Sequence, residues 1–124
     1  MQIVNDPGAP PSTFFSPALA VSDWLFLSGQ GALNQANEIV GDTIEEQTEV
    51  TLENVERLLR AGGCELSDVV SVLVHLANLD DFAGYNAVYE RRFGDPKPVR
   101  TTVGAKLLRG LLVEITITAR RRPQ

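Results

Sequence analysis

Two short stretches near the C-terminus place the strongest limits on the fold. Residues 98–104 and residues 112–117 each alternate with a period of two, which predicts two β-strands. Each stretch carries one charge among uncharged residues, Arg100 in the first and Glu114 in the second. A charge that is removed from water without a partner destabilises the folded chain. Arg100 and Glu114 therefore need each other, water in a cleft, or a ligand.

These two charges leave several interpretations open. The planar guanidinium of Arg100 can bind a ligand carboxylate through two parallel hydrogen bonds, or it can form a salt bridge with a neighbouring acidic side chain. Glu114 can orient or deprotonate a water molecule, or it can simply pair with Arg100. Only one register would place both side chains on one face of a hairpin. The connector is long for a tight hairpin, so the two strands need not be neighbours.

Periodicity along the rest of the chain predicts one α+β domain over residues 1–124, with the order β-β-α-β-α-β-β. Short alternating runs bounded by turn residues predict the strands. Besides the two terminal stretches, the expected strands are Ala18–Val21, Trp24–Leu27 and Val69–Leu76, the last with Val70, Val72, Val74 and Leu76 on one face. Residues 5–13 are rich in proline and are expected to form an arm or loop.

Two helices are expected between these strands. Thr43 and Glu46 form a capping box, and the glycine pair at residues 62–63 ends the amphipathic stretch that follows. Asp80 or Asp81 can cap the second helix. This helix is expected to stop at Gly94 and to bury Phe82, Tyr85, Tyr89 and Phe93.

Two helices can cover only one face of such a sheet, so the expected architecture is a mixed sheet with both helices on one face. Along the last strand, the other face carries Leu112, Glu114, Thr116 and Thr118 and is therefore semi-polar. A face of this kind suits a subunit interface better than open water, which predicts a homo-oligomer.

Composition argues against several classes of function. The net charge of −5 repels phosphate backbones and argues against a nucleic-acid partner. The single cysteine, the lack of signal-peptide features and the lack of a long apolar run predict a cytoplasmic protein with no membrane contact. His75 is expected to be a satisfied core histidine and Cys64 to be inert, and one histidine with one cysteine argues against a metal site.

Several motifs fall in order across nearly the whole chain. They are Ser28-Gly29-Gln30, Leu52-Glu53-Asn54-Val55, Asn86-Ala87-Val88-Tyr89, Pro98-Val99-Arg100-Thr101 and Val113-Glu114-Ile115. Taken together, they resemble the Rid family of reactive intermediate deaminases, also called the YjgF family. The resemblance implies a chorismate-mutase-like fold, assembled as a homotrimer with ligand clefts between subunits.

The resemblance also implies an activity. Members of the family hydrolyse reactive enamines and imines, such as 2-aminoacrylate, 2-iminopropanoate and 2-iminobutanoate, to the 2-keto acid and ammonia, and need no cofactor or metal. By position, Arg100 would bind the carboxylate of the small imino acid and Glu114 would hold or activate the attacking water. The other residues carried over to the substrate pocket are Gly29, Thr102, Ser28, Asn86 and Phe15.

The chain departs from the family pattern at two positions. Phe15 stands where a tyrosine is common, and Val99 stands where the family motif has alanine before the arginine. These departures leave two alternatives: a non-catalytic protein that binds small carboxylates or has a regulatory role, and a deaminase for another enamine such as 3-aminoacrylate or 2-aminomuconate. A third reading, an RNA-acting translation inhibitor, conflicts with the acidic charge balance.

Overall fold

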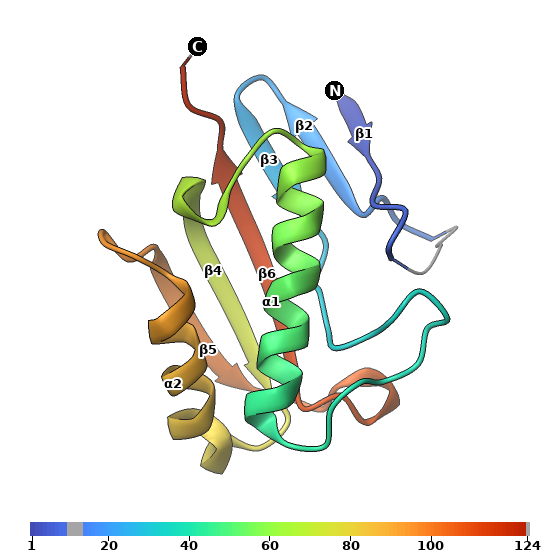
Figure 1. The fold of residues 1–124 in the computed structure, drawn as a ribbon, viewed down its shortest axis with the longest axis vertical. Helices are drawn as coiled ribbons and strands as arrows, with labels where there is room; N and C mark the ends of the chain where they lie inside the picture. The colour runs from blue at the N-terminus through green and yellow to red at the C-terminus, as the bar shows by residue number, and fades with distance from the viewer. Residues whose placement is uncertain (10–13, 124) are drawn as a thin grey trace.

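The computed structural model describes residues 1–9 and 14–123, and within them the chain forms a six-stranded mixed sheet with two α-helices (Figure 1). The strands are β1 (Gln2–Val4), β2 (Ala18–Val21), β3 (Trp24–Leu27), β4 (Val69–Leu76), β5 (Val99–Gly104) and β6 (Val113–Arg120), and the helices are α1 (Ile44–Ala61) and α2 (Phe82–Arg92). Three short 3-10 helices, Leu66–Asp68, Leu79–Asp81 and Leu108–Gly110, lie in the connections of this described part.

The strand order is β1-β2-β3-β6-β4-β5. Strand β4 pairs with β5 in parallel and with β6 in antiparallel fashion, and β1, β2, β3 and β6 follow one another antiparallel. Helices α1 and α2 lie side by side in front of one face of this sheet in Figure 1, as expected from the sequence. The predicted α+β class is confirmed. The element order has one strand more than expected, because residues 2–4 pair with β2.

Local signals act as expected at the first helix. The Thr43 hydroxyl accepts a hydrogen bond from the Glu46 N–H at 3.1 Å and caps α1. The Gly62 N–H donates to carbonyls of the last turn and ends the helix. Of the arm predicted at residues 5–13, residues 5–9 form a loop with a turn, and residues 10–13 lie outside the described residues.

The core lies between the sheet and the helices. Val72, Val74 and Leu76 of β4 point toward α1 and α2 and are at most 1 % exposed. The prediction that Val70 shares their face is wrong: Val70 is 41 % exposed. A β-bulge between Val69 and Ser71 shifts the alternation by one residue at the start of the strand, so Val69 is buried instead.

The opposite face of the sheet carries no helix in the described part of the chain (Figure 1). It presents apolar side chains that are more than one-third exposed. They are Val21, Trp24, Phe26, Leu73 and Val103. Polar residues of β6 are interspersed among them, so this face has the semi-polar character expected from the sequence.

Candidate functional site

Arg100 lies on β5, directly opposite Val72 of β4. Residues that are paired in adjacent strands point to the same face, so Arg100 points toward the helices rather than toward the open face. Its guanidinium carbon lies 4.7 Å from the ring centroid of Tyr89 on α2. The centroids of Phe82 and Tyr85 lie 5.6 Å and 5.7 Å away. The cation therefore rests against three aromatic rings of one helix, an arrangement that attracts a guanidinium.

Asn86 supplies the hydrogen bond that orients this cation. An Arg100 Nη1–H donates to Asn86 Oδ1 at 2.8 Å. Among the described residues, no carboxylate forms an ion pair with Arg100. An open hollow lies beside it, lined by Asn86, Tyr89, Glu90, Lys97, Pro98 and Arg100. Because a guanidinium has five N–H donors, most of them remain available for a ligand carboxylate.

The tyrosines beneath Arg100 are neutral phenols. Burial raises the pKa of Tyr85 well above its usual value, the neighbouring Tyr89 raises it further, and Arg100 opposes this shift. Burial likewise raises the pKa of Tyr89. On the same face of β5, the Thr102 hydroxyl is buried with no hydrogen-bond partner among the described residues. We refer to Arg100, Asn86 and Thr102 together as the arginine side.

Glu114 lies on β6, opposite His75 of β4. Its neighbours Val113 and Ile115 point into the core, so Glu114 points to the helix-free face. The segment after β3 runs beside it, and Gln30 exchanges two backbone hydrogen bonds with Ile115, at 2.8 and 2.9 Å. A Cβ atom added at Gly29 would lie 2.6 Å from Glu114 Oε1. The absence of a side chain at Gly29 therefore makes room for the Glu114 carboxylate.

Phe15 and Ser28 lie next to Gly29 in the fold. Phe15 is 58 % exposed and lines a small cavity together with Gly29. The Ser28 hydroxyl donates to the Ser16 carbonyl at 2.7 Å, so its proton is engaged in holding the chain next to Phe15. We refer to Glu114, Gly29, Ser28 and Phe15 together as the glutamate side.

The two sides lie on opposite faces of the sheet, with β4 between the strands that carry Arg100 and Glu114. The pairing of these two residues, which the sequence left open, is not formed within one chain. The structure thus brings the predicted site residues together as two groups rather than one. A site that uses both charges has to combine the arginine side of one chain with the glutamate side of another.

Two other residues singled out in the sequence, His75 and Cys64, belong to neither group. His75 is half-buried on the helix-free face rather than in the core, and its Nδ1 atom has no hydrogen-bond partner among the described residues. It is therefore not the satisfied core histidine that the sequence suggested. Cys64 is buried, and this burial raises the pKa of its thiol, with Asp68 adding to the shift. A protonated, enclosed thiol agrees with the expectation that Cys64 is inert.

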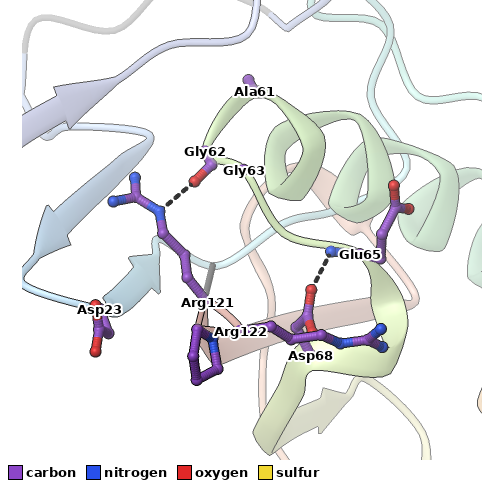
Figure 2. Close-up of a pocket in the computed structure, with 9 residues that line it drawn as sticks. Asp23, Ala61, Gly62, Gly63, Glu65, Asp68, Arg121 and Arg122 are labelled. Carbon is purple, nitrogen blue, oxygen red and sulfur yellow. Dashed lines mark hydrogen bonds and ion pairs between the residues drawn. The ribbon is translucent and has the colours of Figure 1, made fainter.

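A larger hollow lies elsewhere, at the end of α1 and β6, and Figure 2 shows its lining. Arg121 Nε donates to the Gly62 carbonyl at 2.7 Å, and Arg122 Nε forms an ion pair with Asp68 at 2.7 Å. None of the predicted site residues lines it. We do not place the site there, because those contacts already engage its arginines. Within residues 1–9 and 14–123, no three His, Cys, Asp or Glu side chains cluster as metal ligands, and no helix is long and apolar enough to span a membrane.

Sequence reasoning missed the aromatic support of Arg100. Phe82, Tyr85 and Tyr89 recur at helical spacing and were expected to be core residues only. Tyr85 and Tyr89 are buried, but the prediction is wrong for Phe82, which is 41 % exposed. The spacing reveals that they share a face of α2. It does not reveal which strand that face covers, because the neighbour of α2 is set by the pairing of β5 with β4.

Comparison with known proteins matches residues 7–121 to the family described as Endoribonuclease L-PSP. The RutC family protein SSO3206 of Saccharolobus solfataricus is 40 % identical over 109 residues, which cover 86 % of each chain. A 2-iminobutanoate/2-iminopropanoate deaminase of Dermatophagoides farinae is 36 % identical over 117 residues, which cover 92 % of this chain and 91 % of that protein.

Solved structures show the same fold. The crystal structure of TM0215 from Thermotoga maritima superposes with a TM-score of 0.93 at 38 % identity and covers 99 % of both chains. TdcF of E. coli, solved with bound serine, gives a TM-score of 0.89 at 27 % identity and covers 98 % of this chain and all of the other. The chain therefore belongs to the Rid family, also known under the names YjgF, RutC and L-PSP.

Proposed function

We propose that this protein hydrolyses small 2-imino acids and their enamine tautomers to 2-keto acids and ammonia. The observation that carries the proposal is Arg100, a cation that rests on aromatic rings beside an open hollow and has no carboxylate partner in the described chain. A deaminase of this kind and a protein solved with bound serine are both among its relatives. The net charge of −5 argues against RNA as the substrate.

Arg100 binds and orients the substrate in this proposal. Its free N–H groups donate two parallel hydrogen bonds to the substrate carboxylate, while the Asn86 hydrogen bond and the aromatic rings hold the guanidinium in place. Because the substrate carboxylate is held in this way, the imine group next to it has a fixed position and orientation. Positioning of this kind is the main requirement, because an imine is already activated toward water.

Glu114 provides the base. It takes one proton from a water molecule while the water oxygen forms a bond to the imine carbon, and this proton is passed to the imine nitrogen. In the resulting carbinolamine, the hydroxyl proton is transferred to the amino nitrogen as the C–N bond breaks, so that the carbonyl forms and ammonia leaves. One water is consumed, and one keto acid and one ammonia are released.

The proposal includes a homotrimer with the clefts at its subunit contacts. The arginine side and the glutamate side lie on opposite faces of one sheet, so a second copy has to supply the missing half of each cleft. The exposed apolar side chains of the helix-free face give such a contact the surface that it needs.

The test is a coupled assay in which an amino-acid oxidase produces the imino acid and semicarbazide traps it. Addition of the protein should slow semicarbazone formation for small substrates such as 2-iminopropanoate. Arg100→Ala should abolish this effect, because the carboxylate loses its partner, and the matched variant Arg91→Ala, which removes an exposed arginine from α2, should retain it.

Other outcomes would assign a different role. Binding of 2-ketobutyrate in calorimetry without turnover of any imine would indicate a non-catalytic carboxylate-binding protein. Turnover of 3-aminoacrylate or 2-aminomuconate alone would keep the chemistry and change the substrate. Full activity of Arg100→Ala would remove Arg100 from the mechanism.

A further inference from the structure

A chain of hydrogen bonds connects the N-terminal loop with the segment that carries Gly29. It starts at Asp6, whose side chain is 2 % exposed. The Asp6 carboxylate accepts from Arg57 Nε at 2.6 Å and from the Gly8 N–H at 2.8 Å. A buried carboxylate is tolerated only when it is paired in this way. We refer to Asp6, Arg57 and Asn54 together as the N-terminal relay.

Arg57 connects Asp6 to a second residue of α1, Asn54. Its Nη2–H donates to Asn54 Oδ1 at 2.8 Å, one helical turn earlier. A guanidinium can only donate, so this bond fixes which side of the Asn54 amide carries the oxygen. The two N–H groups of Asn54 therefore face the opposite way. They donate to the Gly31 and Leu33 carbonyls, both at 2.9 Å.

The segment at residues 29–33 is thus held from two directions. On one side, Gln30 is bonded to Ile115, the residue after Glu114. On the other side, the relay holds Gly31 and Leu33. Gly29 directly precedes these anchored residues, and the Glu114 carboxylate occupies the space beside it. Movement of the segment would change the surface on which that carboxylate rests.

The N-terminal relay consists of charged and polar side chains, which indicates a role beyond helix packing. An apolar contact between the N-terminal loop and α1 would avoid the cost of burying a charge. The relay instead ends on two carbonyl oxygens of the segment beside Glu114. We infer that the N-terminal relay positions residues 29–33, and through Gly29 the Glu114 carboxylate, so that Asp6, Arg57 and Asn54 are positioning residues for the reaction.

The expected effect on kcat rests on the proposed function, whereas the expected effect on amide hydrogen exchange does not. Asn54→Asp keeps the size of the side chain and the bond to Arg57 but replaces both donors by an acceptor. The Val40 N–H donates to the carbonyl of Ala32, within the segment, at 2.8 Å. Amide hydrogen exchange followed by NMR should show exchange at Gln30, Val40 and Ile115 at least about tenfold faster in this variant. The matched control is Arg60→Gln, which removes exposed ion pairs from the same helix and should change these rates by less than about twofold.

Steady-state kinetics supply the second readout. Asn54→Asp should lower kcat at least about tenfold, with KM within about threefold, because the arginine side that binds the carboxylate is untouched. Asp6→Asn is the second variant, which keeps an oxygen toward Arg57 and removes the charge. It should show the same faster exchange and lower kcat with smaller magnitude. It therefore still tests the inference if Asn54→Asp fails to fold.

The two readouts separate the possible failures. Unchanged exchange at these amides in the folded variants, with only a lower Tm, would reduce the relay to a structural contact and overturn the inference. Faster exchange with unchanged kcat in an active enzyme would also overturn it. If the wild-type protein has no deaminase activity, the proposed function fails, and the exchange rates still decide whether the relay holds the segment.

Discussion

Gly29 illustrates how a single residue can set the position of a charge. The space that a side chain would need there is occupied by Glu114, with only 2.6 Å between the added Cβ and Oε1. Gly29→Ala should therefore push the carboxylate away from the segment and lower kcat by about tenfold to a hundredfold, as expected for a displaced base. The semicarbazone assay measures this change.

Gly94→Ala is the matched control for that substitution. A Cβ at Gly94 meets no atom of the described chain within 4 Å, so this variant should keep both stability and activity. A Gly29→Ala enzyme as active as the Gly94→Ala enzyme would show that the position of Glu114 against this segment is unimportant for the reaction.

At the scale of elements, α2 supports Arg100, and an ion cluster holds α2 to α1. Arg92 is 20 % exposed at its side chain and binds Glu49 at 2.7 Å and Glu56 at 2.6 Å, both on α1. Arg92→Gln should lower the free energy of unfolding by about 1–2 kcal/mol, because two partly buried carboxylates each lose their nearer partner. Urea unfolding followed by circular dichroism measures this loss.

Arg91→Gln provides the comparison on the same helix. Arg91 also binds Glu49, at 3.2 Å, but its side chain is 62 % exposed, so its removal should cost at most about 0.5 kcal/mol. Equal losses in the two variants would mean that burial does not strengthen the contact between the helices.

The sequence predicted most elements because their signals are local. The capping contact of Thr43, the helical spacing of Leu52, Val55 and Leu59, and the alternation in β6 each depend on neighbours within one element. Strand β1 was missed because its three residues are too few to show a period. The face of Val70 was predicted wrongly because a bulge adds a residue that alternation cannot reveal.

The candidate site could be predicted only as a set of residues. Arg100 and Glu114 were recognised as charges that need compensation, and Gly29 and Phe15 as their companions in the family pattern. Their division into two sides follows from β4 lying between β5 and β6, which is a non-local pairing. The contact between Asp6 and Arg57 could not be predicted from the sequence either, because 51 residues separate them and no local pattern relates them.

At the scale of the whole molecule, the two sides predict complementation between inactive chains. Arg100→Ala lacks the carboxylate-binding group and Glu114→Gln lacks the base, so each variant alone should be inactive. In mixed trimers, a cleft between an intact arginine side and an intact glutamate side restores a complete site. Random mixing in equal amounts should therefore recover about a quarter of the wild-type activity per site.

Co-refolding of the two variants followed by the semicarbazone assay measures this recovery, and light scattering gives the mass of the assembly. A double variant with both substitutions in one chain, mixed with itself, is the control and should stay inactive. A mixture that remains inactive although the chains exchange would show that both charges act from the same chain.

The proposed clefts, which combine charges from opposite faces of two sheets, would also make activity depend on protein concentration. A newly made chain carries both charges and yet contains no complete cleft, so catalysis would begin only after a second copy has joined. Below the concentration needed for assembly, the rate would fall with a steep power of dilution rather than in proportion to it. A copy that has lost both charges would likewise inactivate the two clefts to which it contributes, whereas a copy that has lost one charge would inactivate only one.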